Sequence, residues 1–212
     1  MLSISFTAVY QQFISEIQQT SLLEFIAVIT GIASVWYSKK ENILTYPVGL
    51  LNTVIYVYLS IKGRLFGEAS VNFYYTVVSV YGWVLWARKN NEQQRVMLIT
   101  TSTAKQWVRQ LLFFAAFYIG LFFALTYIKT SFAPGAIPWA DAFASATAYT
   151  GMWLMAKKKV ESWVWWILTD FASVPLYFVK GYAFTSIYYF VLLILAFFGL
   201  AEWIKRSKLA SV

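Results

Sequence analysis

The chain contains two copies of one pattern, and each copy is built on three long apolar runs. Both copies carry the same landmarks in the same order: an acid, a tryptophan, two lysines, a polar residue inside an apolar run, a Lys-Gly step and a closing Gly-x-x-x-Trp. The first copy has Glu24, Trp36, Lys39-Lys40, Asn52, Lys62-Gly63 and Gly82-x-x-x-Trp86; the second has Asp141, Trp153, Lys157-Lys158, Asp170, Lys180-Gly181 and Gly199-x-x-x-Trp203. The copies are offset by 117 residues at the outer landmarks and by 118 in the middle. One further apolar run lies between them, so both copies point the same way through a membrane, which is typical of transporters built from parallel repeats.

The composition is that of a membrane protein rather than of a soluble enzyme. Hydrophobic residues fill 60% of the 212 positions and charged residues 12%, whereas soluble domains have about 25% charged residues. The chain has no cysteine and no histidine, which removes the commonest metal ligands and general bases. We therefore expect no enzymatic activity, no cofactor and no metal. The net charge of +8 does not indicate nucleic-acid binding, because the basic residues lie in short segments between apolar runs.

The apolar runs predict an all-α membrane protein with seven transmembrane helices, arranged as two parallel three-helix repeats joined by a linker helix (3+1+3). Each run is long enough to cross a hydrocarbon core of about 30 Å. The expected spans are 21–38, 43–61, 66–87, 108–128, 137–156, 161–179 and 183–204.

The same pattern divides the chain into five units. They are an interfacial segment at 1–20, repeat 1 at 21–90, a cytoplasmic loop with the linker helix and an external loop at 91–136, repeat 2 at 137–208, and a C-terminal tail at 209–212. In the first unit, residues 3–18 have apolar side chains at helical spacing. This spacing fits an amphipathic helix at the membrane surface, and a frayed tail is the alternative.

Lysine and arginine are distributed unequally between the two sides of the predicted bundle. Thirteen lie on one side: Lys39, Lys40, Arg88, Lys89, Arg95, Lys105, Arg109, Lys157, Lys158, Lys159, Lys205, Arg206 and Lys208. Four lie on the other: Lys62, Arg64, Lys129 and Lys180. Because cytoplasmic segments carry the excess of basic residues, we expect the N-terminus outside and the C-terminus in the cytoplasm.

Asp170 is the most informative single residue, because it is an acid near the middle of an apolar run. Trp163 and Trp166 share its helical stripe, at spacings of 3 and 4 residues. A carboxylate at this depth costs roughly 2.5–3.5 kcal/mol on insertion scales, so such residues face the bundle interior and mark a pathway or a binding site. The alternative is a protonated carboxyl that bonds to a neighbouring helix.

Further polar and aromatic residues at depth complete the predicted site. Asn52 takes the place of Asp170 in the first copy, and we expect the two to face each other across the pseudo-two-fold axis. Asn72 and Tyr75 lie one turn apart on a polar stripe. For Asn52 the alternative is an interhelical hydrogen bond, worth about 0.6 kcal/mol in membranes, and for Asn72 it is a role in helix packing. The predicted substrate-binding residues are Asn52, Asn72, Tyr75, Tyr149, Trp163, Trp166, Asp170 and Tyr188.

Three motifs resemble the PnuC family of vitamin transporters. They are Glu161-x-Trp163-x-x-Trp166-x-x-x-Asp170, Tyr81-Gly82-Trp83-x-x-Trp86, and Lys180-Gly181 followed by Tyr188. The resemblance implies a bacterial inner-membrane carrier of 3+1+3 build, similar to SWEET sugar transporters. It also implies facilitated diffusion of nicotinamide riboside, which a cytoplasmic kinase traps by phosphorylation for NAD synthesis. Relatives in this family carry thiamine or riboflavin.

The chemistry of the site residues agrees with such a substrate. Nicotinamide riboside has a planar cationic ring, which indole and phenol faces attract by up to about 2 kcal/mol when desolvated. We expect Trp163, Trp166 and Tyr188 to bracket the ring, and Asp170, Asn52 and Asn72 to bond its polar edges. Thiamine is also a flat cation, so this argument does not separate the two vitamins. Gly63, Pro175 and Gly181 are placed to allow the bends that alternating access needs.

Other interpretations stay open at this point. Asp170 could carry a proton in symport, the cargo could be a sugar as in SWEET carriers, or the chain could be a receptor or scaffold without flux, which the repeat argues against. Besides the substrate and the kinase, the expected partner is the lipid bilayer, and homo-oligomerisation is left open.

Overall fold

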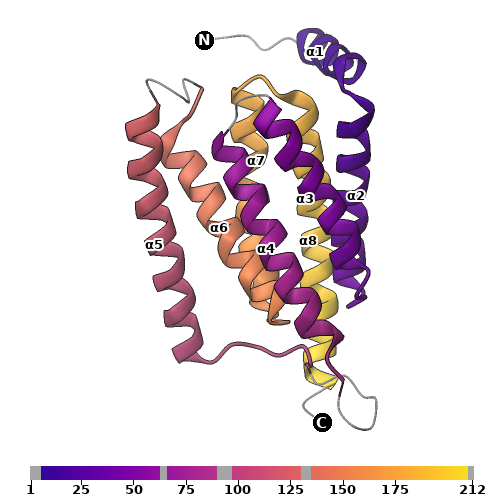
Figure 1. Cartoon of the computed structure of the whole chain (residues 1–212), viewed down its shortest axis with the longest axis vertical. Helices are drawn as coiled ribbons and strands as arrows, with labels where there is room; N and C mark the ends of the chain where they lie inside the picture. The colour runs from indigo at the N-terminus through magenta and orange to yellow at the C-terminus, as the bar shows by residue number, and fades with distance from the viewer. Residues whose placement is uncertain (1–5, 63–65, 90–96, 130–134, 210–212) are drawn as a thin grey trace.

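The computed structural model describes residues 6–62, 66–89, 97–129 and 135–209, and their regular structure is α-helix apart from isolated bridges (Figure 1). The helices are α1 (Phe6–Gln19), α2 (Leu22–Lys39), α3 (Thr45–Lys62), α4 (Phe66–Ala87), α5 (Ala104–Ile128), α6 (Pro138–Ala156), α7 (Glu161–Val179) and α8 (Ala183–Leu209). The all-α prediction is confirmed, and each predicted span is one helix. α5 begins at Ala104, ahead of the predicted start, because Thr103 and Gln106 form a capping box. Gly63, Arg64 and Arg95 lie outside the described residues.

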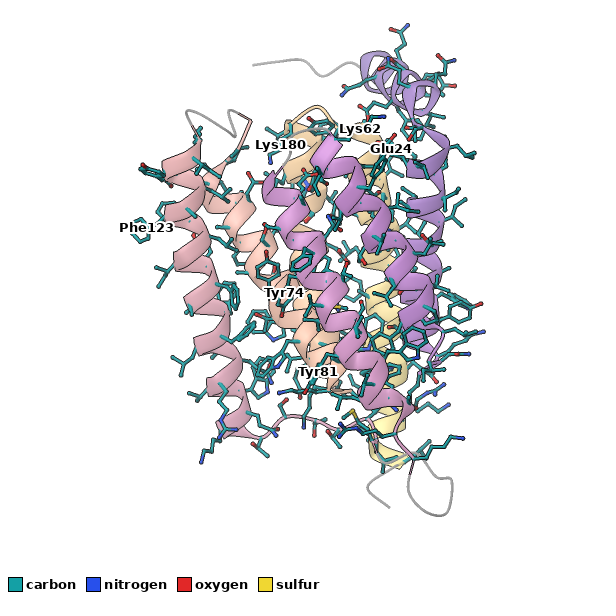
Figure 2. All side chains as sticks on the ribbon, viewed as in Figure 1. Glu24, Lys62, Tyr74, Tyr81, Phe123 and Lys180 are labelled. Carbon is teal, nitrogen blue, oxygen red and sulfur yellow. The ribbon has the colours of Figure 1, made fainter. Side chains whose placement is uncertain are left out.

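Six of the eight described helices form two groups of three, α5 lies beside these groups, and α1 packs on α8. In the first group α2 packs on α3 and α3 on α4; in the second, α6 packs on α7 and α7 on α8. The two groups meet along two seams, α2 against α8 and α4 against α6. α5 packs on α6 at the rim of the bundle (Figure 1). Figure 2 shows Phe123 of α5 pointing away from the other helices.

Three of these helices are long and apolar enough to cross a membrane by length and composition, within the described part of the chain: α2, α5 and α8. The other helices of the two groups carry more polar residues inside their length. On α7, for example, Thr169, Asp170 and Ser173 are all buried. Such residues lower the mean hydropathy of a helix because they are polar, and they are tolerated because they face neighbouring helices rather than lipid.

The structure corrects the register between the two repeats. α2 and α6 both end in a turn whose second residue has a positive φ, 56° at Glu41 and 49° at Lys158, and these two positions are 117 residues apart. The predicted match of Lys39-Lys40 with Lys157-Lys158 is therefore wrong by one residue. The same offset relates Tyr46 to Trp163, which lie against Gly82 and Gly199 respectively.

This register also changes the counterpart of Asn52. α3 and α7 are continuous helices beyond Tyr46 and Trp163, so Asn52 matches Thr169 rather than Asp170. The prediction that Asn52 and Asp170 occupy equivalent places is wrong by one residue. The sequence landmarks in the middle of the repeats align at an offset of 118, whereas the turns that end α2 and α6 fix an offset of 117. One residue along a helix rotates a side chain by about 100°, so the two residues point to different neighbours.

α1 is seated on the start of α8 rather than frayed. The Glu16 carboxylate accepts hydrogen bonds from the backbone N–H of Ala183 at 3.0 Å and of Phe184 at 2.7 Å, and Gln12 donates to the carbonyl of Gly181. Free N–H groups at a helix start need such acceptors. α1 therefore connects the first helix of one group to the last helix of the other.

Candidate functional site

Asp170 on α7 is buried, and one of its oxygens has no hydrogen-bond partner. Its exposed fraction is 2%, and Oδ1 is among the few buried polar atoms without a partner in the described part of the chain. The carboxyl lies close enough to the phenols of Tyr75, Tyr188 and Tyr189 to interact electrostatically with each. Buried polar groups are normally satisfied, so a carboxyl oxygen without a partner in the described residues, within electrostatic range of three phenols, is a candidate contact for a bound cation.

An aromatic group from α4, α6 and α7 forms one side of this site. The ring of Tyr75 lies 6.0 Å from that of Trp166 and 6.3 Å from that of Tyr149. Tyr74 packs 4.4 Å from Tyr149 and donates a hydrogen bond of 3.1 Å to the Tyr149 carbonyl. These centroid distances are those of interacting aromatic pairs. Three predicted site residues, Tyr75, Tyr149 and Trp166, are thus brought together.

Asn52 and Tyr188 form the opposite side, at the seam between α2 and α8. Asn52 on α3 donates from Nδ2 to the carbonyl of Ala27 at 2.6 Å. The side chains of Asn52 and Tyr188 both reach the backbone of Gly31 on α2. Tyr188 is in turn within electrostatic range of Asp170. The two seams of the bundle therefore each contribute predicted residues, with Asp170 between them.

Two predicted residues have other surroundings. Asn72 donates from Nδ2 to the Glu68 carbonyl of its own helix, at 2.9 Å. Trp163 is 1% exposed and packs edge-on against Trp203, with centroids 5.6 Å apart. Trp163 belongs to a buried cluster at the end of the bundle where α8 ends (Figure 1), which we call the C-terminal end.

Reciprocal contacts between the two groups close this C-terminal end. Trp86 of α4 donates to the Ala156 carbonyl at the end of α6, at 3.2 Å, and Trp203 of α8 donates to the Ser38 carbonyl near the end of α2, at 3.1 Å. The two indole rings lie 6.0 Å apart. Each repeat thus uses its closing Gly-x-x-x-Trp to bond the other repeat, and the centre of this end is filled with aromatic rings.

Glu24 and Asp141, at the opposite end, accept hydrogen bonds at the starts of their helices. Glu24 completes a capping box with Ser21 at the start of α2. Asp141 accepts from the Ile137 N–H at 2.7 Å and pairs with Lys180 at 2.5 Å. Figure 2 shows Glu24, Lys62 and Lys180 together at this end, away from the C-terminus.

Sequence reasoning missed Tyr46, whose OH is also buried without a partner in the described residues. Tyr46 packs edge-on against Trp86 at 5.1 Å, as its counterpart Trp163 packs against Trp203. The indole N–H of Trp163 is likewise unpartnered. The glycine of each Gly-x-x-x-Trp motif could have indicated these two residues, because Gly82 lies against the Tyr46 ring and Gly199 against the Trp163 ring.

Sequence reasoning also missed a hydrogen-bond network that holds α5 against Trp165 of α7. The Glu161 carboxylate accepts from the Ser102 N–H and from its hydroxyl, both at 2.7 Å. Gln110 on α5 donates to Ser102 and accepts from the Trp165 indole at 3.1 Å. This network joins α5 to α7 through buried polar groups, so the linker helix is held to the second repeat.

The fold and the site define a class of protein. A helical bundle with membrane-length helices, an internal repeat, and a buried carboxyl within electrostatic range of tyrosines from both repeats is a membrane transporter of small molecules. Its relatives agree with this class.

A profile of the family described as nicotinamide mononucleotide transporter matches residues 21–205. The chain therefore belongs to this family, and its resemblance to PnuC proteins is confirmed. It is 26% identical to the riboflavin/roseoflavin transporter RibM of Streptomyces davaonensis over 180 residues, which cover 85% of this chain and 83% of RibM. It is 22% identical to the nicotinamide riboside transporter PnuC of Escherichia coli over 208 residues, 89% of this chain and 87% of that protein.

A solved structure shares the fold. The crystal structure of the vitamin B3 transporter PnuC superposes with a TM-score of 0.71 at 22% sequence identity, and the match covers 94% of this chain and 88% of that one.

Proposed function

We propose that this chain is a seven-span carrier of 3+1+3 build that passes nicotinamide riboside across the bacterial inner membrane by facilitated diffusion. Its N-terminus lies outside and its C-terminus in the cytoplasm, where a kinase traps the substrate by phosphorylation for NAD synthesis. The observation that best supports this substrate is the buried carboxyl of Asp170: its Oδ1 has no partner among the described residues, and the carboxyl is within electrostatic range of three phenols. A flat cation satisfies that carboxyl and the aromatic faces at once.

The residues fall into roles that match the parts of this substrate. Asp170 balances the charge of the pyridinium ring, while Trp166 and Tyr75 offer ring faces to it. Asn52 and Tyr188 supply amide and hydroxyl groups for the carboxamide or the ribose. In this arrangement Trp163 supports the site from the closed C-terminal end, rather than bracketing the ring itself.

Alternating access requires the two ends to open in turn. Opening the C-terminal end to the cytoplasm breaks the bonds that Trp86 and Trp203 make across the repeats, and the ion pair of Lys158 with Glu41. Pro175 lies inside α7, and Gly181 follows it with φ +83°; both are points where the backbone can bend. The outer face of α5 is apolar and faces lipid. Phe123 on this face is 65% exposed.

Riboflavin is the second candidate substrate, because RibM is a relative of this chain over most of its length. Riboflavin offers a larger flat ring without a permanent charge, so it uses the aromatic faces but has no need of a carboxylate. The role of Asp170 therefore separates the two substrates.

Calorimetric binding to the purified chain tests the proposal. Nicotinamide riboside, its phosphate, thiamine and riboflavin are titrated into wild type and Asp170→Asn. We expect nicotinamide riboside to bind, its phosphate to bind poorly because of the added negative charge, and Asp170→Asn to weaken riboside binding at least about tenfold. Binding of riboflavin alone, unchanged in Asp170→Asn, would replace the riboside as the substrate.

A further inference from the structure

We propose that Gly31 is a positioning residue of the substrate site. Its missing side chain lets Tyr188 of the second repeat reach Asn52 of the first, so that one site is built from both repeats. This inference rests on the proposed function, because it concerns how two residues of that site are held in place.

The contact at Gly31 leaves no room for a side chain. A Cβ added there would lie 2.3 Å from Tyr188 Oη, 3.4 Å from Tyr188 Cζ and 2.9 Å from Asn52 Nδ2. Gly31 is buried inside the regular helix α2, so no unusual backbone angle requires a glycine. Glycine weakens a helix interior relative to alanine. The close approach of Tyr188 is therefore the feature that accounts for this residue.

The other seam of the bundle is built differently. The counterpart of Gly31 at the offset of 117 is Ala148 on α6, which is 2% exposed. There the neighbouring Tyr149 packs against Tyr74 with rings 4.4 Å apart. At one seam the hydroxyl of Tyr188 lies against the backbone of Gly31, and at the other the rings of Tyr74 and Tyr149 pack together at an angle of 44°. This difference makes the site asymmetric, as an asymmetric vitamin requires.

A methyl group at position 31 would act mainly on Tyr188. The tyrosine side chain is rigid, so its hydroxyl cannot move away from an added Cβ unless the whole ring swings. Asn52 Nδ2 is the end of a short side chain that also bonds to the Ala27 carbonyl. We therefore expect Gly31→Ala to move the Tyr188 ring away from Asn52 and out of the range of Asp170, while α2 stays helical.

The test is a double-mutant cycle of binding affinity with nicotinamide riboside as the titrant. The variants are Gly31→Ala, Tyr188→Phe and their combination. Gly120→Ala is the control, because an added Cβ at Gly120 on α5 meets no atom within 4 Å. We expect Gly31→Ala to weaken binding at least about tenfold and Tyr188→Phe only a few-fold. The combined variant should bind within a few-fold of Tyr188→Phe, because removing the hydroxyl removes the shortest contact and leaves only the amide end of Asn52, 2.9 Å from the added Cβ, to shift.

Two results would overturn the proposal: affinity of Gly31→Ala within twofold of wild type, or a combined variant that binds at least tenfold more weakly than Tyr188→Phe. If Gly31→Ala does not fold, the combined variant is measured instead, because its closest aromatic ring atom is 3.4 Å from the new methyl and only the short amide side chain of Asn52, at 2.9 Å, has to shift. A role in packing alone would lower the melting temperature and leave the affinity of the folded protein unchanged. Failure of the wild type to bind the riboside would instead contradict the proposed substrate.

Discussion

Lys158 and Glu41 form an ion pair between equivalent places of the two repeats, with Nζ 2.6 Å from Oε1 and 117 positions between them. Each residue follows the last turn of its helix with a positive φ, a conformation that non-glycine residues rarely adopt. Lys158 also donates to the Met97 carbonyl at 2.9 Å and is only 1% exposed. The pair therefore joins the repeats at the C-terminal end, next to the Trp86 and Trp203 contacts.

Breaking this ion pair should destabilise the chain strongly. Glu41→Gln leaves the buried ammonium of Lys158 without its carboxylate, and removing one partner of a buried pair costs about 3–5 kcal/mol. Unfolding by denaturant in detergent micelles measures the loss. Glu202→Gln is the comparison, because the Glu202–Arg206 pair is 37% and 35% exposed and Arg206 keeps a second carboxylate, Glu41, at 3.5 Å; such exposed pairs are worth about 0–1 kcal/mol. Equal losses in both variants would show that the buried pair has no special weight.

Loss of either indole bond should loosen the C-terminal end. Trp86→Phe or Trp203→Phe keeps an aromatic ring but removes the donor to the other repeat, a bond worth about 1 kcal/mol and hence about a fivefold rise in opening. The natural chain has no cysteine, so Ser162→Cys, at a fully buried position, gives a clean maleimide label. We expect labelling to accelerate about fivefold in either variant. Trp36→Phe, at a 42% exposed tryptophan, should leave it unchanged; acceleration there as well would point to general loosening.

Replacing Trp166 should mainly weaken substrate binding, whereas replacing Trp163 should mainly lower the free energy of unfolding. Trp166→Ala removes a ring beside Tyr75 and should weaken riboside binding at least about tenfold. Trp163→Ala empties a buried position against Gly199, so it should cost about 3–5 kcal/mol of unfolding free energy with a smaller change in the affinity of the folded protein. Calorimetry and denaturant unfolding on both variants give the comparison. The reverse pattern would return Trp163 to the site, as the sequence stripe alone suggests.

This pair also shows what a sequence stripe can predict. Helical spacing places Trp163, Trp166 and Asp170 on one face, and that face is indeed turned toward the bundle. It does not say at which depth another helix supplies a partner, so it cannot show that Trp163 meets Trp203 while Trp166 meets Tyr75. Apolar runs of membrane length need no partner to be recognised, which is why the helices themselves are predicted well.

Contacts between distant parts of the chain are the features that the sequence leaves undetermined. Glu161 belongs to the α7 motif and Ser102 to no motif, and only the fold shows that they bond each other. The register of the repeats is also undetermined by the sequence. The Lys-Lys landmarks match at an offset of 118, whereas the backbone turns at Glu41 and Lys158 match at 117.

Docking of α1 should protect the start of α8. Glu16→Ala removes the acceptor of the Ala183 and Phe184 N–H groups, and loss of such a cap costs about 0.5–2 kcal/mol. Hydrogen exchange followed by mass spectrometry should show faster exchange over residues 183–188 in this variant. Gln19→Ala removes only a bond to Ser15 within α1 and should not change exchange in α8. Unaltered exchange in Glu16→Ala would mean that α1 does not dock in solution.

Transport itself is the most direct test of the account. The purified chain is reconstituted into liposomes, and entry of labelled nicotinamide riboside is followed with and without an imposed pH gradient. We predict uptake that levels off at the external concentration, does not respond to the gradient, and exchanges with unlabelled riboside on the other side. Absence of flux, or accumulation above the external concentration driven by the gradient, would contradict a carrier that works by facilitated diffusion.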